Sequence, residues 1–197
     1  MVRRYSRKPV PADVLDRVLG IAASGPSAGF SQGTDLLVLE GRSQVRQFFA
    51  LTSDPEFLAE PRELDGLLQA PVIVLALSDP SVYVARYAEA DKARSSLAGL
   101  PAEKWPVPYW LVDCSFTVML LLLAATDAGL GALFFRLHRD PGELLSALGV
   151  PDTKQVIGAV ALGYEASADS SDAPRTIGSP TRRVRRPIGE VVHRGRW

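Results

Sequence analysis

Residues 108–135 form the longest apolar run in the sequence, and this run constrains the fold more than any other stretch. From residue 114 to residue 125 no side chain carries a charge, and only Ser115 and Thr117 carry hydroxyl groups. A helix that is apolar on every face must be buried on every face. The run therefore predicts a core helix. A polar residue at its start, Asp113, makes that end a candidate border of a site.

A membrane span is a weaker interpretation of the same run, because the uncharged part has about a dozen residues and a span needs roughly twenty. The single cysteine, Cys114, cannot form an intramolecular disulfide, which is typical of a reducing compartment. The net charge is zero, so no global field attracts nucleic acid or a membrane surface. We therefore expect a cytoplasmic protein that binds neither of them.

Apolar periodicity predicts alternating helices and strands within a single domain, residues 1–197. Helices are expected over residues 13–23, 44–51 and 63–69, and from Asp140-Pro141 to Gly149; strands are expected over residues 35–40, 71–78, 131–137 and 155–164. The strand over residues 71–78 is apolar throughout, which indicates burial on both faces.

Two stretches have no clear periodicity. Residues 79–107 mix aromatic and polar residues, which is typical either of a lid or substrate-side insertion or of one surface helix over residues 82–93. Residues 165–197 are rich in Ser, Asp and Pro at first and basic later, which predicts an extended C-terminal arm.

Residues 26–33, Pro-Ser-Ala-Gly-Phe-Ser-Gln-Gly, form a loop between a predicted helix and a predicted strand. Glycine permits close approach of the backbone to a ligand, and Ser27, Ser31 and Gln32 offer side-chain hydrogen bonds. The loop lacks the Gly-Lys-Ser/Thr end of a nucleotide-triphosphate loop. From this chemistry alone, a binding loop and a plain connection are equally well supported.

Positive charge gathers at both ends of the chain. Residues 175–197 contain seven arginines and one acid, Glu190, and residues 3–8 add three arginines and Lys8. If the two basic ends converge in space they can hold an anion such as a phosphate. A solvated basic tail explains the same charges.

Residue sets for side-chain catalysis or metal binding are not visible. The two histidines, His138 and His193, are far apart in the sequence, and neither has a carboxylate or cysteine at metal-ligand spacing. No Gly-x-Ser-x-Gly motif is present. We therefore predict no catalytic side chain and no metal site, and expect an enzyme to take its chemistry from a bound cofactor.

An ordered set of short patterns covers nearly the whole chain. It runs from the Arg-rich start and Pro-Val-Pro through Pro-Ser-Ala-Gly-x-Ser-Gln and Ala-Pro-Val-Ile-Val. It continues through Ala-Gly-Leu-Gly, Leu-Gly-Val-Pro and Leu-Gly-Tyr to Arg-Arg-Pro-Ile. This order resembles the FMN-dependent nitroreductase family. The resemblance implies an α+β fold, a three-layer sandwich in which a mixed central sheet is flanked by helices. It also implies a homodimer with the long apolar helix in its core and two flavin sites shared between subunits.

The resemblance also implies which residues contact the flavin. The phosphate would be held by basic residues near both ends, and the ring and ribityl chain by the loop, the start of the long helix and the strand that follows it. The matching positions are Arg3, Pro26, Ser27, Ala28, Gln32, Asp113, Leu133, Phe134 with the adjacent Phe135, Arg183 and Arg185. The family's turn would reach the flavin from the partner subunit.

Several positions depart from the family pattern. The first two residues of the N-terminal basic motif would precede Met1, and Gln32 is followed by Gly33 and Thr34 rather than by Pro and Trp. Arg136 and Leu137 stand where many members have an acidic residue and a glycine. Arginine reverses the charge beside the flavin ring and favours an anionic substrate or reduced flavin, unless it points away.

The sequence and the family resemblance leave three possible functions to distinguish. The first is an oxidoreductase in which FMN takes hydride from NADH or NADPH and passes electrons to a small-molecule acceptor such as a nitroaromatic or a quinone. The second is a flavin- or deazaflavin-binding protein with low turnover, which serves storage, sequestration or regulation. The third, a nucleic-acid-binding module, is disfavoured by the zero net charge.

Overall fold

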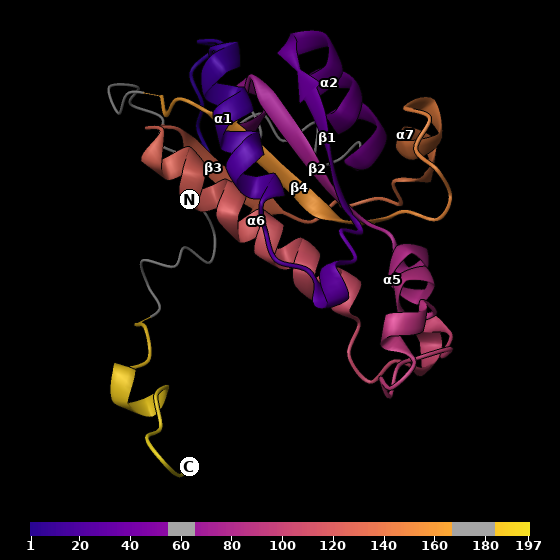
Figure 1. Ribbon diagram of the computed structural model, residues 1–197. Helices are drawn as coiled ribbons and strands as arrows, with labels where there is room; N and C mark the ends of the chain where they lie inside the picture. The colour runs from indigo at the N-terminus through magenta and orange to yellow at the C-terminus, as the bar shows by residue number, and fades with distance from the viewer. Residues whose placement is uncertain (55–65, 167–183) are drawn as a thin grey trace. The chain divides into compact units, whose positions relative to one another are not determined.

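A four-stranded sheet with the strand order β1-β2-β4-β3 lies at the centre of the fold (Figure 1). Its strands are β1 (Thr34–Glu40), β2 (Val72–Ser78), β3 (Gly131–Phe135) and β4 (Gln155–Gly163). These bounds agree with the four strands expected from the sequence to within a few residues. All seven residues of β2 are buried, which confirms the strand predicted to be covered on both faces.

The computed structural model describes residues 1–54, 66–166 and 184–197. The chain divides into two units, Met1–Ser167 and Ala168–Trp197, which are treated separately below. The sheet, its helices and the loop at residues 26–33 belong to the first unit.

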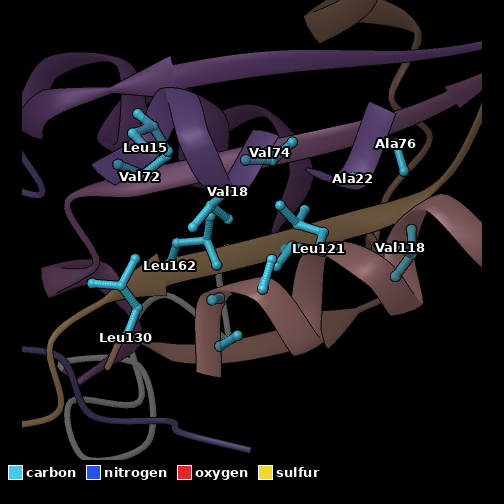
Figure 2. Packing of buried hydrophobic residues seen from close by; sticks show 14 of the residues in the cluster. Leu15, Val18, Ala22, Val72, Val74, Ala76, Val118, Leu121, Leu130 and Leu162 are labelled. Atoms are coloured by element: carbon cyan, nitrogen blue, oxygen red, sulfur yellow. The ribbon is translucent and has the colours of Figure 1, made fainter. Parts of the chain in front are cut away.

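One face of the sheet is covered by α1 (Ala12–Ala23) and α6 (Tyr109–Asp127). Leu15, Val18 and Ala22 of α1 recur at helical spacing and meet Leu121 of α6 over alternate residues of the strands (Figure 2). The strand residues in this layer are Val72, Val74, Ala76, Val160 and Leu162.

The opposite face is covered by α2 (Gly41–Thr52) and α7 (Gly142–Ala147). Val45, Phe48 and Phe49 of α2 pack with Leu144 of α7 over the intervening strand residues, Ile73, Leu75, Leu77, Ala159 and Ala161. Because side chains alternate along each strand, both faces are apolar and both are covered. The three-layer arrangement expected from the family resemblance is therefore present.

The strand directions differ from the expectation of a mixed sheet. Each described pairing, β1 with β2, β2 with β4 and β3 with β4, is antiparallel. A mixed sheet needs at least one parallel pair, so that expectation is corrected for the strands the structure describes. A fully apolar strand such as β2 indicates two covered faces but not the direction of its neighbours.

Helix α6 is long and apolar enough to cross a membrane by length and composition, a test that core helices also pass. One side of it is packed inside the protein, with Cys114, Leu121 and Ala125 fully buried. Along the other side, Leu111, Phe116, Met119 and Leu123 are 36%, 46%, 55% and 59% exposed. We call these four residues the α6 stripe. Within one chain the helix is thus buried on one side only, and the burial of its other side in a dimer core stays a prediction.

Residues 79–107 form a small aromatic layer beside the N-terminal end of α6 (Figure 1). They contain α5 (Pro80–Tyr87) and short 3-10 turns at Ala90–Lys92 and Ala102–Lys104. Tyr83 and Trp105 are buried here against Trp110 of α6. The alternative of one helix over residues 82–93 is therefore wrong, because the α-helix ends at Tyr87.

The remaining expected elements are only partly described. Of the helix expected over residues 63–69, the described part is a turn at Gly66 and a 3-10 turn at Leu67–Gln69, and residues 63–65 lie outside the described residues. The end of the chain has one 3-10 turn, Ile188–Glu190, and His193 stacks on Trp197. The prediction of a single domain with a C-terminal arm from residue 165 stays a prediction.

Candidate active site

The loop at residues 26–33 has an unusual backbone. Its 3-10 turn, Ala28–Phe30, contains Gly29 at φ 62°, and both Phe30 and Gln32 also have positive φ, at 58° and 56°. Glycine adopts this left-handed region at no steric cost, whereas a bulky residue there is an outlier. The loop therefore holds two side-chain-bearing residues in a costly conformation.

Hydrogen bonds within the loop fix this conformation. The amide N–H of Gln32 donates to Oγ of Ser27 at 2.9 Å, and Oγ of Ser31 donates to the carbonyl oxygen of Ala28 at 2.7 Å. The hydroxyl groups of both serines are thus used inside the loop. The Ser27 hydroxyl accepts a hydrogen bond that supports the loop backbone, and its expected contact with a flavin stays a prediction.

Helices α5 and α6 hold the same loop from outside. Nε of Arg86, on α5, donates to the carbonyl oxygen of Gly29 at 2.9 Å, while the rest of its guanidinium pairs with Asp91. The amide N–H of Ala28 donates to Oδ2 of Asp113, on α6, at 2.8 Å. A side chain at Gly29 would also collide with the ring of Tyr87, so glycine is required there for space as well as for φ.

Asp113 is only 4% exposed and lies beneath the loop. Its Oδ2 accepts a second hydrogen bond, from the hydroxyl of Tyr83, at 2.8 Å. Burial and this hydrogen bond raise the pKa of Tyr83 above its ordinary value, so the phenol stays protonated and remains a donor. Asp113 thus joins the loop to the aromatic layer, and a direct contact between Asp113 and a flavin stays a prediction.

The thiol of Cys114 lies next to this pair. It is fully buried and points toward the carbonyl oxygen of Leu77. Burial raises the pKa of the Cys114 thiol to about 12, against a smaller lowering by a hydrogen bond with Thr34. A thiol in this state is a small core side chain and not a nucleophile.

A groove of about 480 Å³ opens beside the loop. Pro26, Ser27 and Gln32 form one wall, while α1, β1 and Thr117 of α6 form the others. Its volume lies within the usual range for small-molecule sites, about 300–1,000 Å³. Three of the predicted cofactor residues therefore line one cavity, and Ala28 and Asp113 lie in or directly under the same loop.

Three other predicted residues lie near the opposite end of α6. The amide N–H of Val2 bonds to the carbonyl oxygen of Ala132, which places Arg3 beside the start of β3. Leu133 is buried, whereas Phe134 is half-buried at the same strand. The predicted site residues of the first unit thus form two groups within one chain. The loop group is Pro26, Ser27, Ala28, Gln32 and Asp113, and the β3 group is Arg3, Leu133 and Phe134.

The two predicted C-terminal arginines lie outside the first unit. Arg183 lies outside the described residues, and Arg185 belongs to the second unit. A common phosphate site for Arg3 and these arginines stays a prediction. Arg136 is exposed directly after β3. Within residues 1–54, 66–166 and 184–197, no group of three or more His, Cys, Asp and Glu side chains could hold a metal ion.

Comparison with known proteins assigns this arrangement to a family. The model of the Nitroreductase family matches residues 1–164, which include the sheet, the loop and α6. The chain belongs to the nitroreductase family.

Individual relatives are distant. A protein of Archaeoglobus fulgidus is 23% identical over 168 residues, which cover 83% of this chain and 79% of the relative. One from Methanothermobacter thermautotrophicus is 25% identical over 169 residues, covering 84% and 72%. The names of both assign them provisionally as NADH dehydrogenase/NAD(P)H nitroreductase.

Solved structures of nitroreductase family proteins share the fold. One from Clostridium difficile has a TM-score of 0.65 at 19% identity, covering all of this chain and 93% of the other. One from Streptococcus pneumoniae has a TM-score of 0.67 at 20% identity, covering 98% and 94%. The α+β fold of this nitroreductase-family chain is thus confirmed by its structural neighbours.

Sequence reasoning missed the residues that support the loop. Tyr83 and Arg86 lie in the stretch without periodicity, so no pattern separated them from surface residues. Nothing in the sequence singles out Phe30, because an aromatic residue in a loop is ordinary unless its φ angle is known. The one signal in the sequence is the presence of glycine at residues 29 and 33, before and after Phe30.

Proposed function

We propose that this protein is an FMN-dependent oxidoreductase that takes hydride from NADH or NADPH and reduces a small aromatic acceptor such as a nitroaromatic or a quinone. The match to the nitroreductase family over residues 1–164 carries the proposal, because it supports an oxidoreductase. The provisional names of the two relatives support the use of a nicotinamide donor. A cytoplasmic location is part of the proposal.

The residues of the site suit FMN. The loop group offers an open groove of sufficient volume, with hydroxyl and amide side chains on one wall. The β3 group offers the guanidinium of Arg3, and arginine is well suited to a phosphate. FMN, when bound, would supply the hydride chemistry. The chain's own residues would bind the phosphate at Arg3, orient the ring between β3 and the loop, and exclude water.

The two groups lie toward opposite ends of α6, which favours their serving different flavins within a single chain. Asp113 and Asp127 mark opposite ends of α6, and an α-helix of that length spans about 21 Å. In a two-fold dimer whose α6 helices cross antiparallel, the loop group of one subunit meets the β3 group of the other. We therefore propose a homodimer with two shared sites.

The α6 stripe supports this dimer. Four large apolar side chains along one side of α6 are partly exposed to solvent within one chain. Burying a Leu, Phe or Met side chain completely contributes roughly 1.5–3 kcal/mol, so covering the stripe on both subunits favours association. The aromatic layer at residues 79–107 borders the loop group through Ala28, which supports the proposal that this layer is a substrate-side lid.

The visible spectrum of the purified protein tests the proposal. We expect the absorption of bound oxidised flavin, which bleaches when NADH or NADPH is added without oxygen and returns when an aromatic acceptor is added. A colourless protein whose apo form does not bind added FMN would refute the proposed function. Flavin that stays oxidised with both nicotinamides would instead favour a flavin- or deazaflavin-binding protein with low turnover, which the exposed Arg136 beside β3 also motivates.

A further inference from the structure

Phe30 combines two unfavourable features in one residue. Its φ of 58° lies in the left-handed region, and its side chain is 73% exposed. Backbone strain of this kind persists only where the surroundings enforce it, and it is concentrated at functional sites. The chain contains no Asn, and the residue that best suits this conformation, glycine, occupies the preceding position instead.

The surroundings of Phe30 enforce its conformation from both sides. Asp113 holds the amide of Ala28, and Arg86 holds the carbonyl of Gly29. On the other side, Ser27 holds the amide of Gln32. None of these contacts involves the Phe30 ring. The loop is therefore braced in a way that presents the ring to solvent and does not pack it into the core.

We infer that Phe30 is a ligand-contacting residue that stacks on a planar aromatic molecule, either the aromatic electron acceptor or the flavin ring. The inference rests on the proposed function. Aromatic rings attract each other in stacked and edge-to-face arrangements beyond the effect of buried area. Phe30 lies in the chain between Ser27 and Gln32, which both line the groove, although Phe30 itself is not one of the lining residues.

If the proposal is right, removing the Phe30 ring should raise the stability of the apo protein and weaken ligand binding. Phe30→Gly and Phe30→Asn both remove the ring and relieve the backbone, since glycine and asparagine tolerate positive φ. We expect the apo protein to melt about 2–4 °C higher. Loss of one stacking contact is expected to lower binding about three- to tenfold. Phe30→Tyr retains both the ring and the strain, and should resemble wild type in both measurements.

Two measurements distinguish the possible ligands. The first is the dissociation constant of FMN for apo protein, from the quenching of flavin fluorescence. The second is the ratio of kcat/KM for menadione to kcat/KM for ferricyanide, which is not aromatic, with NADPH as donor. A weaker FMN complex in the glycine variant assigns the ring to the flavin. A three- to tenfold fall in the ratio assigns it to the acceptor.

Other results overturn the inference. If Phe30→Gly lowers the melting temperature, the ring is a packing residue. If neither the FMN dissociation constant nor the acceptor ratio changes, the ring contacts no ligand. If the variant changes only the sedimentation coefficient, the ring packs on a second copy of the chain. If wild-type protein binds no FMN, the proposed function is refuted and this inference with it. If wild-type protein binds FMN and turns over but the Phe30 variants bind and react as wild type does, only this inference is refuted.

Discussion

The hydroxyl of Tyr83 donates to Oδ2 of Asp113 at 2.8 Å, and the amide of the loop residue Ala28 donates to the same oxygen. One buried carboxyl group therefore connects α5, α6 and the loop that lines the groove. Removing it leaves two donors without their acceptor in a buried region, so the change should be felt in stability as well as in binding.

Asp113→Ala should lower the free energy of unfolding by about 1–3 kcal/mol, the cost of leaving buried donors unsatisfied. Urea denaturation followed by circular dichroism measures it. The matched control is Asp127→Ala, the same substitution at the exposed end of the same helix, which should change stability by no more than about 0.5 kcal/mol. Equal effects of the two substitutions would contradict the bracing role of Asp113.

Gly33→Ala should destabilise the protein. A Cβ atom at residue 33 would lie 2.5 Å from Cε2 of Tyr83 and 3.0 Å from the carbonyl oxygen of Asp79. Overpacking of this kind costs about 1–3 kcal/mol. Gly20→Ala is the control, because nothing lies within 4 Å of its new Cβ and alanine favours helix α1 by roughly 0.5–1 kcal/mol. The two variants should therefore shift the thermal midpoint in opposite directions.

Met119→Glu should prevent dimer formation. Met119 is the centre of the α6 stripe, and a carboxylate there would have to be buried between subunits. Analytical ultracentrifugation should show a monomer for this variant and a dimer for wild type. Gln47→Glu, on an exposed position of α2 across the sheet, adds the same group and should remain dimeric. Wild type that sediments as a monomer at all concentrations would exclude the shared site.

Stability should fall at acid pH through Asp79. Burial alone would raise the pKa of this carboxyl, but hydrogen bonds from Ser81 and Thr153, together with Lys154, hold the pKa below its ordinary value. The folded state therefore binds the proton less readily than the unfolded chain does. The resulting stabilisation is complete above the unfolded pKa, about 3.9, and is lost as pH falls below it toward the lowered folded value.

The free energy of unfolding, measured by urea titration between pH 6 and about pH 2, checks this expectation. Asp79→Asn retains a side-chain oxygen that can cap α5 but does not titrate, so its curve should be flatter in the acid range. Asp16→Asn removes the same charge from an exposed position of α1 and serves as the control. Identical acid slopes for wild type and Asp79→Asn would be the contrary outcome.

Cys114 should resist alkylation in the native protein. With its thiol pKa raised to about 12 by burial, the thiolate is scarce at pH 8 and no solvent path reaches the sulfur. Iodoacetamide at pH 8 should add no mass to folded protein and one carbamidomethyl group to urea-unfolded protein. Rapid modification of the folded state would mean that this end of α6 opens readily.

The elements that follow local periodicity could be predicted from the sequence. Helix α1 and strand β2 lie within two residues of their expected bounds, because apolar spacing and flanking prolines define both locally. The start of α7 is also predicted by a local signal, the Asp140-Pro141 pair. Asp140 accepts a hydrogen bond from the amide of Gly142, although the residue at the cap position is Pro141.

The aromatic layer and the loop conformation could not be predicted in this way. Tyr83, Trp105 and Trp110 come from separate segments and pack together only in the folded chain, so no local period records them. The positive φ of Phe30 depends on hydrogen bonds to Asp113 and Arg86, which are distant in sequence. The direction of the strands likewise depends on how the chain returns to the sheet, which burial patterns do not encode.

The strand order β1-β2-β4-β3 has a consequence for biosynthesis. β4 is the last strand of the sheet to be synthesised, yet it lies between β2 and β3 and pairs with both. While the first 154 residues are emerging, the inner edge of β2 and the whole of β3 have no partner in the sheet. The sheet can close only when residues 155–163 have left the ribosome, so the nascent chain exposes aggregation-prone apolar edges until late in translation.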